Sequence, residues 1–454
     1  MRVERQNEDE GRYRAVCDEI RDLRSRLDQL EKERDAMRPG DTGRLPSANR
    51  EPRHVLDGYK VLDFTQVLAG ATVTRLMAEM GAEIIKVELT PNGDFSRSLP
   101  FLKERRSGFF VQQNRGKKSL CVDVKKPEGL ALLKKLLPKV DVLVENFTPG
   151  VIARMGLGYE TVRAINPRIV MCSVSAMGQT GPLASEPGYD YIGQAYAGVT
   201  YMIGDPDGLP AVPILGLGDV SVGVHAMGAI ACALLYREHT GRGQYLDIAI
   251  LDSYFHCHEI NVQAYSASGG AIKPRRSGSQ NPYYCPGGVF RGRQGDFIIA
   301  AIFDHQWAAL CKVMGRPELA QDPRYATNGK RREHQAEVVE LVQDWLSSMP
   351  SDEEAVRLLK ESRIPIAPVL SIEQAVNHPH LRQRHTVRTI RDRIMGEFDI
   401  PGFPLKFSEF PDELPLDAPF LGEHNAEVLQ KYLGYTAERV RRLELDGVLG
   451  RAET

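Results

Sequence analysis

Residues 60–88 read KVLDFTQVLAGATVTRLMAEMGAEIIKVE, and this stretch decides the expected fold. A short apolar run at 60–64 precedes an amphipathic stretch at 72–80 and a second β-branched run at 83–88. This order predicts a strand, a helix and a second strand. Two strands joined through a helix run parallel in one sheet, with the helix packed on its face.

The same alternation continues toward the C-terminus. Helices are predicted at 127–137, before Asn166 and at 252–264, strands at 140–145 and 168–173, and a turn followed by a strand at 241–250. The pattern favours a parallel sheet wrapped by helices on both faces, a Rossmann-like α/β domain. Ligands of such sheets bind beyond the carboxyl ends of the strands.

Composition divides the chain into four parts. Residues 1–52 are a charged segment and linker, and 53–265 form the large domain. Residues 266–375 begin with loops and continue as a smaller α+β domain, with a strand expected at 297–302 and helices at 304–314, 334–348 and 352–362. Residues 376–454 form a linker and a C-terminal segment that returns to the large domain, with a helix at 422–432.

Within residues 12–38, apolar side chains recur at alternating spacings of three and four. The heptad seam predicts a short coiled coil, and a free solvated helix is the alternative. We expect the segment to pair with another copy or to dock on the folded body, without serving the active site. The seam consists of Tyr13, Val16, Ile20, Leu23, Leu27, Leu30 and Met37, with Arg34 in the interrupted position.

Charge and cysteine content exclude several classes of protein. The 454 residues carry a formal net charge of −2, which provides no general attraction for nucleic acid or anionic membranes. The apolar runs are broken by Gly, Asp and Pro, and the N-terminus begins with charged residues, so we expect neither secretion nor membrane insertion. Seven cysteines without metal-ligand spacing predict reduced thiols, no metal and a cytoplasmic protein.

Asp219 is the leading candidate for a catalytic residue. It follows Gly216-Leu-Gly218 and precedes an uncharged apolar run at 220–235, which predicts a helix packed nearly all round, with His225 in the core. Backbone N–H groups at the start of this helix would keep the carboxylate ionised, and the two glycines would let a substrate approach. The alternative is that Asp219 only caps the helix.

Other segments indicate what the sheet binds. The turn at 68–72 has one glycine where a dinucleotide fingerprint needs three, so we expect no nicotinamide or flavin. The basic turn at 114–118 could bind a compact anion, and the alternative is that it is a solvated loop. The corner at 145–150, with Arg154 one turn further on, is typical of anion binding. Asp190 suits either a second site carboxylate or a structural hydrogen bond.

Together these motifs resemble the class III CoA-transferase family, which includes formyl-CoA transferase, carnitine CoA-transferase and α-methylacyl-CoA racemase. The resemblance covers about residues 57–435. It rests on 61–70, 76–88, 114–120, 144–150, 154–156, 218–219 and 240–244, in order.

The resemblance implies an interlocked homodimer of open rings, each with a Rossmann-like domain and a small domain joined by long linkers. It implies that Asp219 attacks an acyl-CoA, forming a mixed anhydride and then an aspartyl-CoA thioester that a carboxylic acid acceptor resolves. Coenzyme A is then the co-substrate. The implied CoA site comprises Val67, Leu68, Ala69, Lys118, Asn146, Phe147 and Arg154, and the implied substrate site comprises Tyr189, Asp190 and a shortened glycine lid at Gly287 and Gly288.

Two alternatives stay open. The first is a 2-methylacyl-CoA racemase, although its catalytic histidine falls on Tyr189, and tyrosine, with a reference pKa of about 10, is a poor base at neutral pH. The second is a non-catalytic CoA-binding scaffold.

Overall fold

The computed structural model describes residues 22, 25–26, 29 and 51–452. The chain divides into two compact units, residues 1–51 and 52–454, and the second is described here. The coiled coil predicted at 12–38 lies outside the described residues, apart from residues 22, 25–26 and 29.

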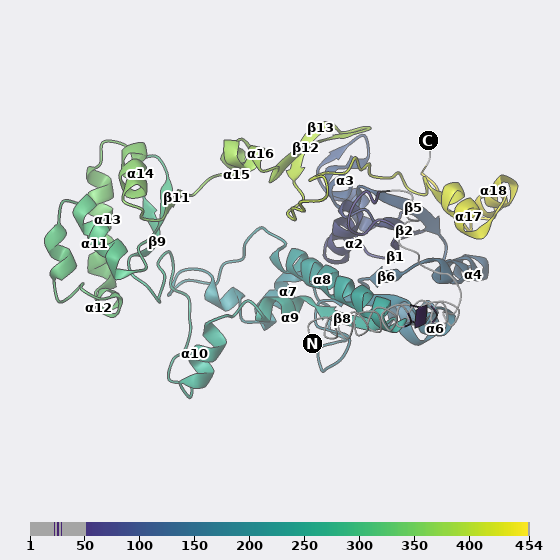
Figure 1. Ribbon diagram of the computed structural model, residues 1–454, viewed down its shortest axis with the longest axis horizontal. Coiled ribbons are helices and arrows are strands. Elements are labelled where there is room, and N and C mark those ends of the chain that lie inside the picture. The colour runs from purple at the N-terminus through teal and green to yellow at the C-terminus, as the bar shows by residue number, and fades with distance from the viewer. Residues whose placement is uncertain (1–21, 23–24, 27–28, 30–50, 453–454) are drawn as a thin grey trace, which may run out of the picture. The chain divides into compact units, whose positions relative to one another are not determined.

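A six-stranded parallel sheet forms the centre of the large domain (Figure 1). Its strands, in spatial order, are β5 (Lys117–Val122), β2 (Glu83–Leu89), β1 (Lys60–Asp63), β6 (Val142–Glu145), β7 (Val170–Ser175) and β8 (Tyr245–Ala249). This is the strand order of a dinucleotide-binding fold, and it confirms the predicted parallel α/β sheet. The order reverses between β1 and β6, and ligands of such sheets bind at this reversal, beyond the carboxyl ends of the strands.

The strands are apolar because the sheet is covered on both faces. Val61 and Val142 pack in a core with α2 (Ala69–Glu79) and α8 (Leu217–Thr240). Their neighbours Leu62 and Leu143 pack on the opposite face with α4 (Pro127–Leu136). Alternate residues therefore serve two separate cores, which explains the nearly continuous hydrophobic runs.

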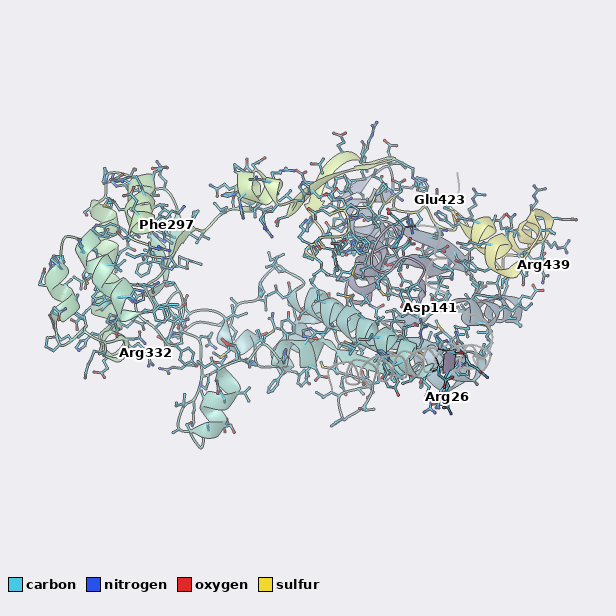
Figure 2. All side chains as sticks on the ribbon, viewed as in Figure 1. Arg26, Asp141, Phe297, Arg332, Glu423 and Arg439 are labelled. Atoms are coloured by element: carbon cyan, nitrogen blue, oxygen red, sulfur yellow. The ribbon has the colours of Figure 1, made fainter. Side chains whose placement is uncertain are left out.

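Helix α8 is anchored to the sheet at its C-terminal end. Arg237 of α8 forms an ion pair with Asp141, with 3.0 Å between Nη2 and Oδ1. The other carboxylate oxygen of Asp141, labelled in Figure 2, accepts the backbone N–H of Lys60 at 2.8 Å. This carboxylate therefore ties the end of α8 to the start of β1.

Helices α2 and α8 approach closely through a glycine. A Cβ atom on Gly223 would lie 2.7 Å from Cβ of Thr72 and 3.0 Å from the carbonyl oxygen of Ala69. We expect Gly223→Ala to lower the free energy of unfolding by about 1–3 kcal/mol, because the helices must separate. Gly228→Ala is the control in the same helix, since a Cβ there would meet nothing within 4 Å. Equal urea midpoints for the two variants would contradict this packing.

The prediction that α8 is enclosed nearly all round is wrong. One side packs on α2, β7 and α9 (Ile250–Phe255), but Val224 is 44% exposed and Leu235 61% exposed. His225 is also exposed, contrary to the expected core position. By length and composition alone, α8 could cross a membrane. Its packing against the sheet accounts for one apolar side and leaves the other uncovered in the single chain.

The small domain has its own hydrophobic core. A three-stranded antiparallel sheet contains β9 (Gly287–Arg291), β10 (Asp296–Ala300) and β11 (Ile366–Pro368), with β10 in the centre. The predicted helices are α11 (Asp304–Val313), α13 (Gln335–Ser348) and α14 (Asp352–Glu361). Figure 1 shows them beside this sheet, and their apolar faces meet around the buried Trp307.

Several segments differ from the prediction. The helix expected at 252–264 is two helices, α9 and α10 (Asn261–Ala267), and the linker after 376 contains a hairpin, β12 (Val387–Asp392) and β13 (Gly396–Pro401). Helices α17 (Asn425–Leu433) and α18 (Ala437–Leu445) follow. The chain then pairs with β5, where Gly450 donates its N–H to the carbonyl of Cys121 at 3.0 Å. This contact covers an otherwise open sheet edge.

Candidate active site

Asp219 lies in the first turn of α8 but does not cap it. The N-cap residue of α8 is Gly216, which has no side chain to accept a capping hydrogen bond. The Asp219 side chain is half-buried and accepts no hydrogen bond from residues 51–452. The cap alternative is therefore excluded, and the carboxylate is available for chemistry.

Asp190 takes the backbone N–H groups that were expected to stabilise Asp219. It begins α7 (Asp190–Tyr196) and is buried. Its Oδ2 accepts N–H groups from Gly218 at 3.0 Å and Asp219 at 3.1 Å. Its Oδ1 accepts the hydroxyl of Tyr254 on α9. Asp190 thus caps α8 from a different helix and fixes the backbone that carries Asp219.

The expectation that Asp219 is held strongly ionised is wrong. Burial, and then the negative charge of Asp190, raise the pKa of Asp219 to about 7. The carboxylate and the carboxylic acid are therefore both well populated near neutral pH. Such a shift is typical of a reacting carboxylate.

A buried chain of hydrogen bonds supports Asp190. Gln194 donates to the Tyr254 hydroxyl at 3.1 Å, and Thr200 donates to Gln194 at 2.9 Å. Burial and the adjacent Asp190 raise the pKa of Tyr254, so its hydroxyl stays a donor. A Cβ on Gly218 would lie 2.2 Å from the Tyr254 ring, so this glycine makes room for tyrosine rather than for substrate.

The predicted CoA residues after β1 and β6 meet at the strand-order reversal. The Oδ1 atom of Asn146 accepts the N–H of Gln66 at 2.7 Å, and its Nδ2 donates to the Gln66 carbonyl at 3.0 Å. This clasp brings Val67–Ala69 together with Asn146 and Phe147. A Cβ on Gly216 would lie 2.5 Å from Cδ2 of Leu68, so the turn also reaches the start of α8.

The N-terminal end of α2 offers unpaired donors at this place. The preceding residue, Leu68, makes no capping hydrogen bond with its side chain. Within the described part of the chain, the N–H groups of Leu68, Ala69 and Gly70 have no hydrogen-bond partner. Free N–H groups at a helix start bind anions or a developing oxyanion. The site therefore combines an available carboxylate with nearby donors.

Arg154 and Lys118 have different surroundings. Arg154 ends α5 (Val151–Arg154), is exposed and forms no ion pair with any residue between 51 and 452. Lys118 lies near the amino end of β5, where Nζ binds Glu83 at 2.8 Å and Glu427 at 2.6 Å. Asn146 lies beyond the carboxyl end of β6, so the structure does not bring Lys118 to the predicted CoA corner.

We expect Arg154→Ala to raise KM for a CoA thioester about tenfold, because a guanidinium forms charge-assisted bonds with phosphate. The kcat should stay within about threefold if Arg154 acts in binding, as the sequence predicts. Lys118→Ala is the matched control and should leave KM unchanged while lowering Tm. The opposite pattern in steady-state kinetics would place the phosphates beside Lys118.

The remaining predicted residues do not converge on Asp219. Tyr189 precedes Asp190 but its side chain is 81% exposed. Gly287 and Gly288 begin β9 and pair with Ala300 and Ile299 of β10, so they form part of a strand rather than a free glycine loop. No hydrogen bond within the described part of the chain joins them to Asp219.

The described residues contain no group of three or more His, Cys, Asp or Glu that could hold a metal ion. The site does include residues that the sequence did not single out, chiefly Tyr254 and Gln194. Tyr254 is 64 residues from Asp190, and no local spacing links the two.

The fold is a parallel α/β sheet, and its candidate site holds a half-buried carboxylate in the first turn of α8. Residues 56–425 match the family described as CoA-transferase family III, and the chain belongs to this family of enzymes.

Similar proteins support the assignment. The chain is 34% identical over 418 residues to "Succinyl-CoA:glutarate CoA-transferase" of Mus musculus, covering 91% of this chain and 94% of the relative. It is 36% identical to "Acetyl-CoA:oxalate CoA-transferase" of Acetobacter aceti, covering 84% and 97%. A CAIB/BAIF family protein from Brucella suis superposes with a TM-score of 0.74 at 31% identity, covering 84% of this chain and 100% of that one.

Proposed function

We propose that this enzyme moves CoA from an acyl-CoA to a carboxylic acid, with Asp219 as the nucleophile. The supporting observation is the Asp219 carboxylate itself, which is half-buried and unpaired in the first turn of α8. The Leu68 side chain, at the start of α2, packs against Gly216 three residues before it. A carboxylate nucleophile needs shielding from water and donors for the oxyanion that forms on the attacked carbonyl.

The first half-reaction forms and consumes an anhydride. An Asp219 oxygen attacks the thioester carbonyl carbon, the carbon–sulfur bond breaks, and CoA leaves as a thiolate. The thiolate attacks the Asp219 carbonyl carbon of the anhydride and expels the donor acid as a carboxylate. The enzyme then carries CoA as an aspartyl thioester, without net gain or loss of a proton.

The second half-reaction runs in reverse with a new acid. The acceptor carboxylate attacks the Asp219 thioester carbon, which forms a second anhydride and releases the thiolate. The thiolate attacks the acceptor carbonyl carbon, which yields acceptor-CoA and frees the Asp219 carboxylate. Leu68 and Ile250 supply apolar surroundings that limit hydrolysis of the anhydride.

A panel of acyl-CoA donors and carboxylic acids, read by mass spectrometry, tests this function. Succinate, glutarate and oxalate belong in the panel because they occur in the names of relatives. The expected result is a new acyl-CoA whose formation needs both donor and acid. Tight CoA binding without exchange across the panel would favour the scaffold alternative.

Racemisation is the in-family alternative. Tyr189 falls at the place of the racemase histidine, and its side chain is exposed and makes no hydrogen bond with the described residues. Incubation of a 2-methylacyl-CoA in deuterium oxide tests this alternative. CoA transfer predicts that no deuterium enters the α-carbon. Incorporation of deuterium there would support racemisation.

We also propose that two copies associate through the uncovered side of α8. Val220, Val224 and Leu235 on α8 and Phe255 at the end of α9 are exposed apolar residues, a pattern typical of an interface. We expect Val224→Glu to weaken the dimer more than tenfold, as measured by sedimentation. Leu445→Glu, at an exposed apolar residue of α18, is the control and should leave the mass unchanged.

A further inference from the structure

Val67 has an unusual backbone conformation. Its φ is +60°, in the left-handed region that a β-branched residue rarely adopts. The N–H of Val67 donates to Oδ1 of Asp94 at 3.1 Å. Conformations of this kind persist only where the surrounding structure imposes them.

The two residues before Val67 are held as well. Lys86 donates to the carbonyl of Thr65 at 2.7 Å, and Asn146 binds both backbone groups of Gln66. Lys86 and Asp94 are buried and form an ion pair with 2.8 Å between Nζ and Oδ2. Three side chains from three different segments therefore fix the path of one short turn.

This turn has direct consequences for the site. Leu68, the next residue, contacts Gly216 just before Asp219, and α2 begins at Ala69. A change of backbone conformation at Val67 would move the Leu68 wall and redirect the unpaired N–H groups of Leu68, Ala69 and Gly70. Displacements of about 1 Å in such groups can cost about 100-fold in rate.

We propose that Asp94 is a positioning residue that holds Val67 in the left-handed conformation, so that Leu68 and the start of α2 face Asp219. Asp94 acts through the turn and touches no reacting atom. The proposal rests on the proposed function, since its kinetic test requires CoA exchange. The alternative is that the Lys86 and Asp94 pair serves only folding.

Two substitutions separate these roles. Asp94→Asn keeps a side-chain oxygen that can accept the Val67 N–H but loses the charge, whereas Asp94→Ala loses both. Both variants should show a lower Tm, because Lys86 loses its partner. Only Asp94→Ala should lose kcat, by about 30-fold or more, with Asp94→Asn within about fivefold of the wild type.

Asp392→Ala provides a matched control. Asp392 is buried and pairs with Arg106 at 2.7 Å, in the hairpin after the small domain. This variant should lose stability and keep kcat within about threefold. If Asp94→Ala keeps as much kcat as Asp392→Ala, the Asp94 proposal is overturned.

A compensating glycine sharpens the test. Glycine adopts the left-handed region without a steric cost, so Val67→Gly in the Asp94→Ala background should restore kcat about tenfold. No recovery would contradict the proposal. If Asp94→Ala does not fold, Asn146→Ala removes two bonds from the same turn and must show the same loss and the same recovery.

Hydrogen exchange provides a readout that needs no activity. The Val67 N–H is part-buried and hydrogen-bonded to Asp94 in the wild type, so it should exchange faster by at least tenfold in Asp94→Ala and not in Asp392→Ala. Equal exchange rates in Asp94→Ala and the wild type would show that Asp94 does not hold the Val67 backbone. A wild type with a protected Val67 N–H but no CoA exchange would instead refute the proposed function.

Discussion

Asp219→Ala is expected to lower CoA exchange by about 10³–10⁵-fold, because the reaction loses the atom that forms both covalent intermediates. Asp190, the neighbouring carboxylate, cannot substitute for it. Asp190 is buried and already accepts two backbone N–H groups and the hydroxyl of Tyr254. Full exchange by the alanine variant would rule out Asp219 as nucleophile.

Asp219→Asn shows whether the loss is chemical. The raised pKa of Asp219 means that the folded state binds a proton more tightly than the unfolded state, so the carboxylate lowers stability as pH rises from about 4 to about 7. The carboxamide removes this cost. We expect Asp219→Asn to be inactive with a Tm at pH 8 equal to or above that of the wild type.

The second large effect is expected from substitutions of Asp190, which should shift the pH dependence of kcat/KM. The wild-type kcat/KM should rise with pH through a midpoint at about 7, as Asp219 ionises. Asp190→Asn should move this midpoint down by about 0.5–1.5 pH units, because it removes the like charge while burial remains. Tyr254→Phe should move it up, because the Asp190 charge loses a hydrogen-bond donor.

The sign of these two shifts is decisive. Movement in the same direction, or no movement in either variant, would contradict the electrostatic coupling of Asp190 to Asp219. Asp190→Ala leaves two buried N–H groups without an acceptor, so it should cost about 2–4 kcal/mol of unfolding free energy. It should also lower kcat about 100-fold, since the backbone of Asp219 is no longer held.

The sheet could be predicted because each strand and helix is specified by a short, continuous stretch of sequence. Each strand is a short β-branched run, and residues 60–88 alone contain a complete strand, helix and strand. The prediction that α8 is enclosed nearly all round was wrong, because an apolar sequence looks the same whether a helix face is buried in the core or left uncovered in the single chain. Lys118 was misplaced because a basic turn does not reveal that β5 already begins at Lys117.

The candidate nucleophile could also be predicted from its local sequence, but the residues that position the site around it could not. Asp219 directly precedes a long uncharged apolar run at 220–235. The bonds that position the site join Val67 to Asp94, Gln66 to Asn146 and Asp190 to Tyr254, at separations of 27, 80 and 64 residues. Such partners follow from the strand order and helix packing, which residue spacing alone does not specify.

Covalent trapping of Asp219 during turnover tests the central claim most directly. The enzyme, an acyl-CoA donor and hydroxylamine are mixed, and the digested peptides are read by mass spectrometry. The account predicts a hydroxamate on Asp219, formed only with donor present and absent from Asp219→Asn. Exchange at full rate with Asp219 unmodified, or with the label on another residue, would contradict it.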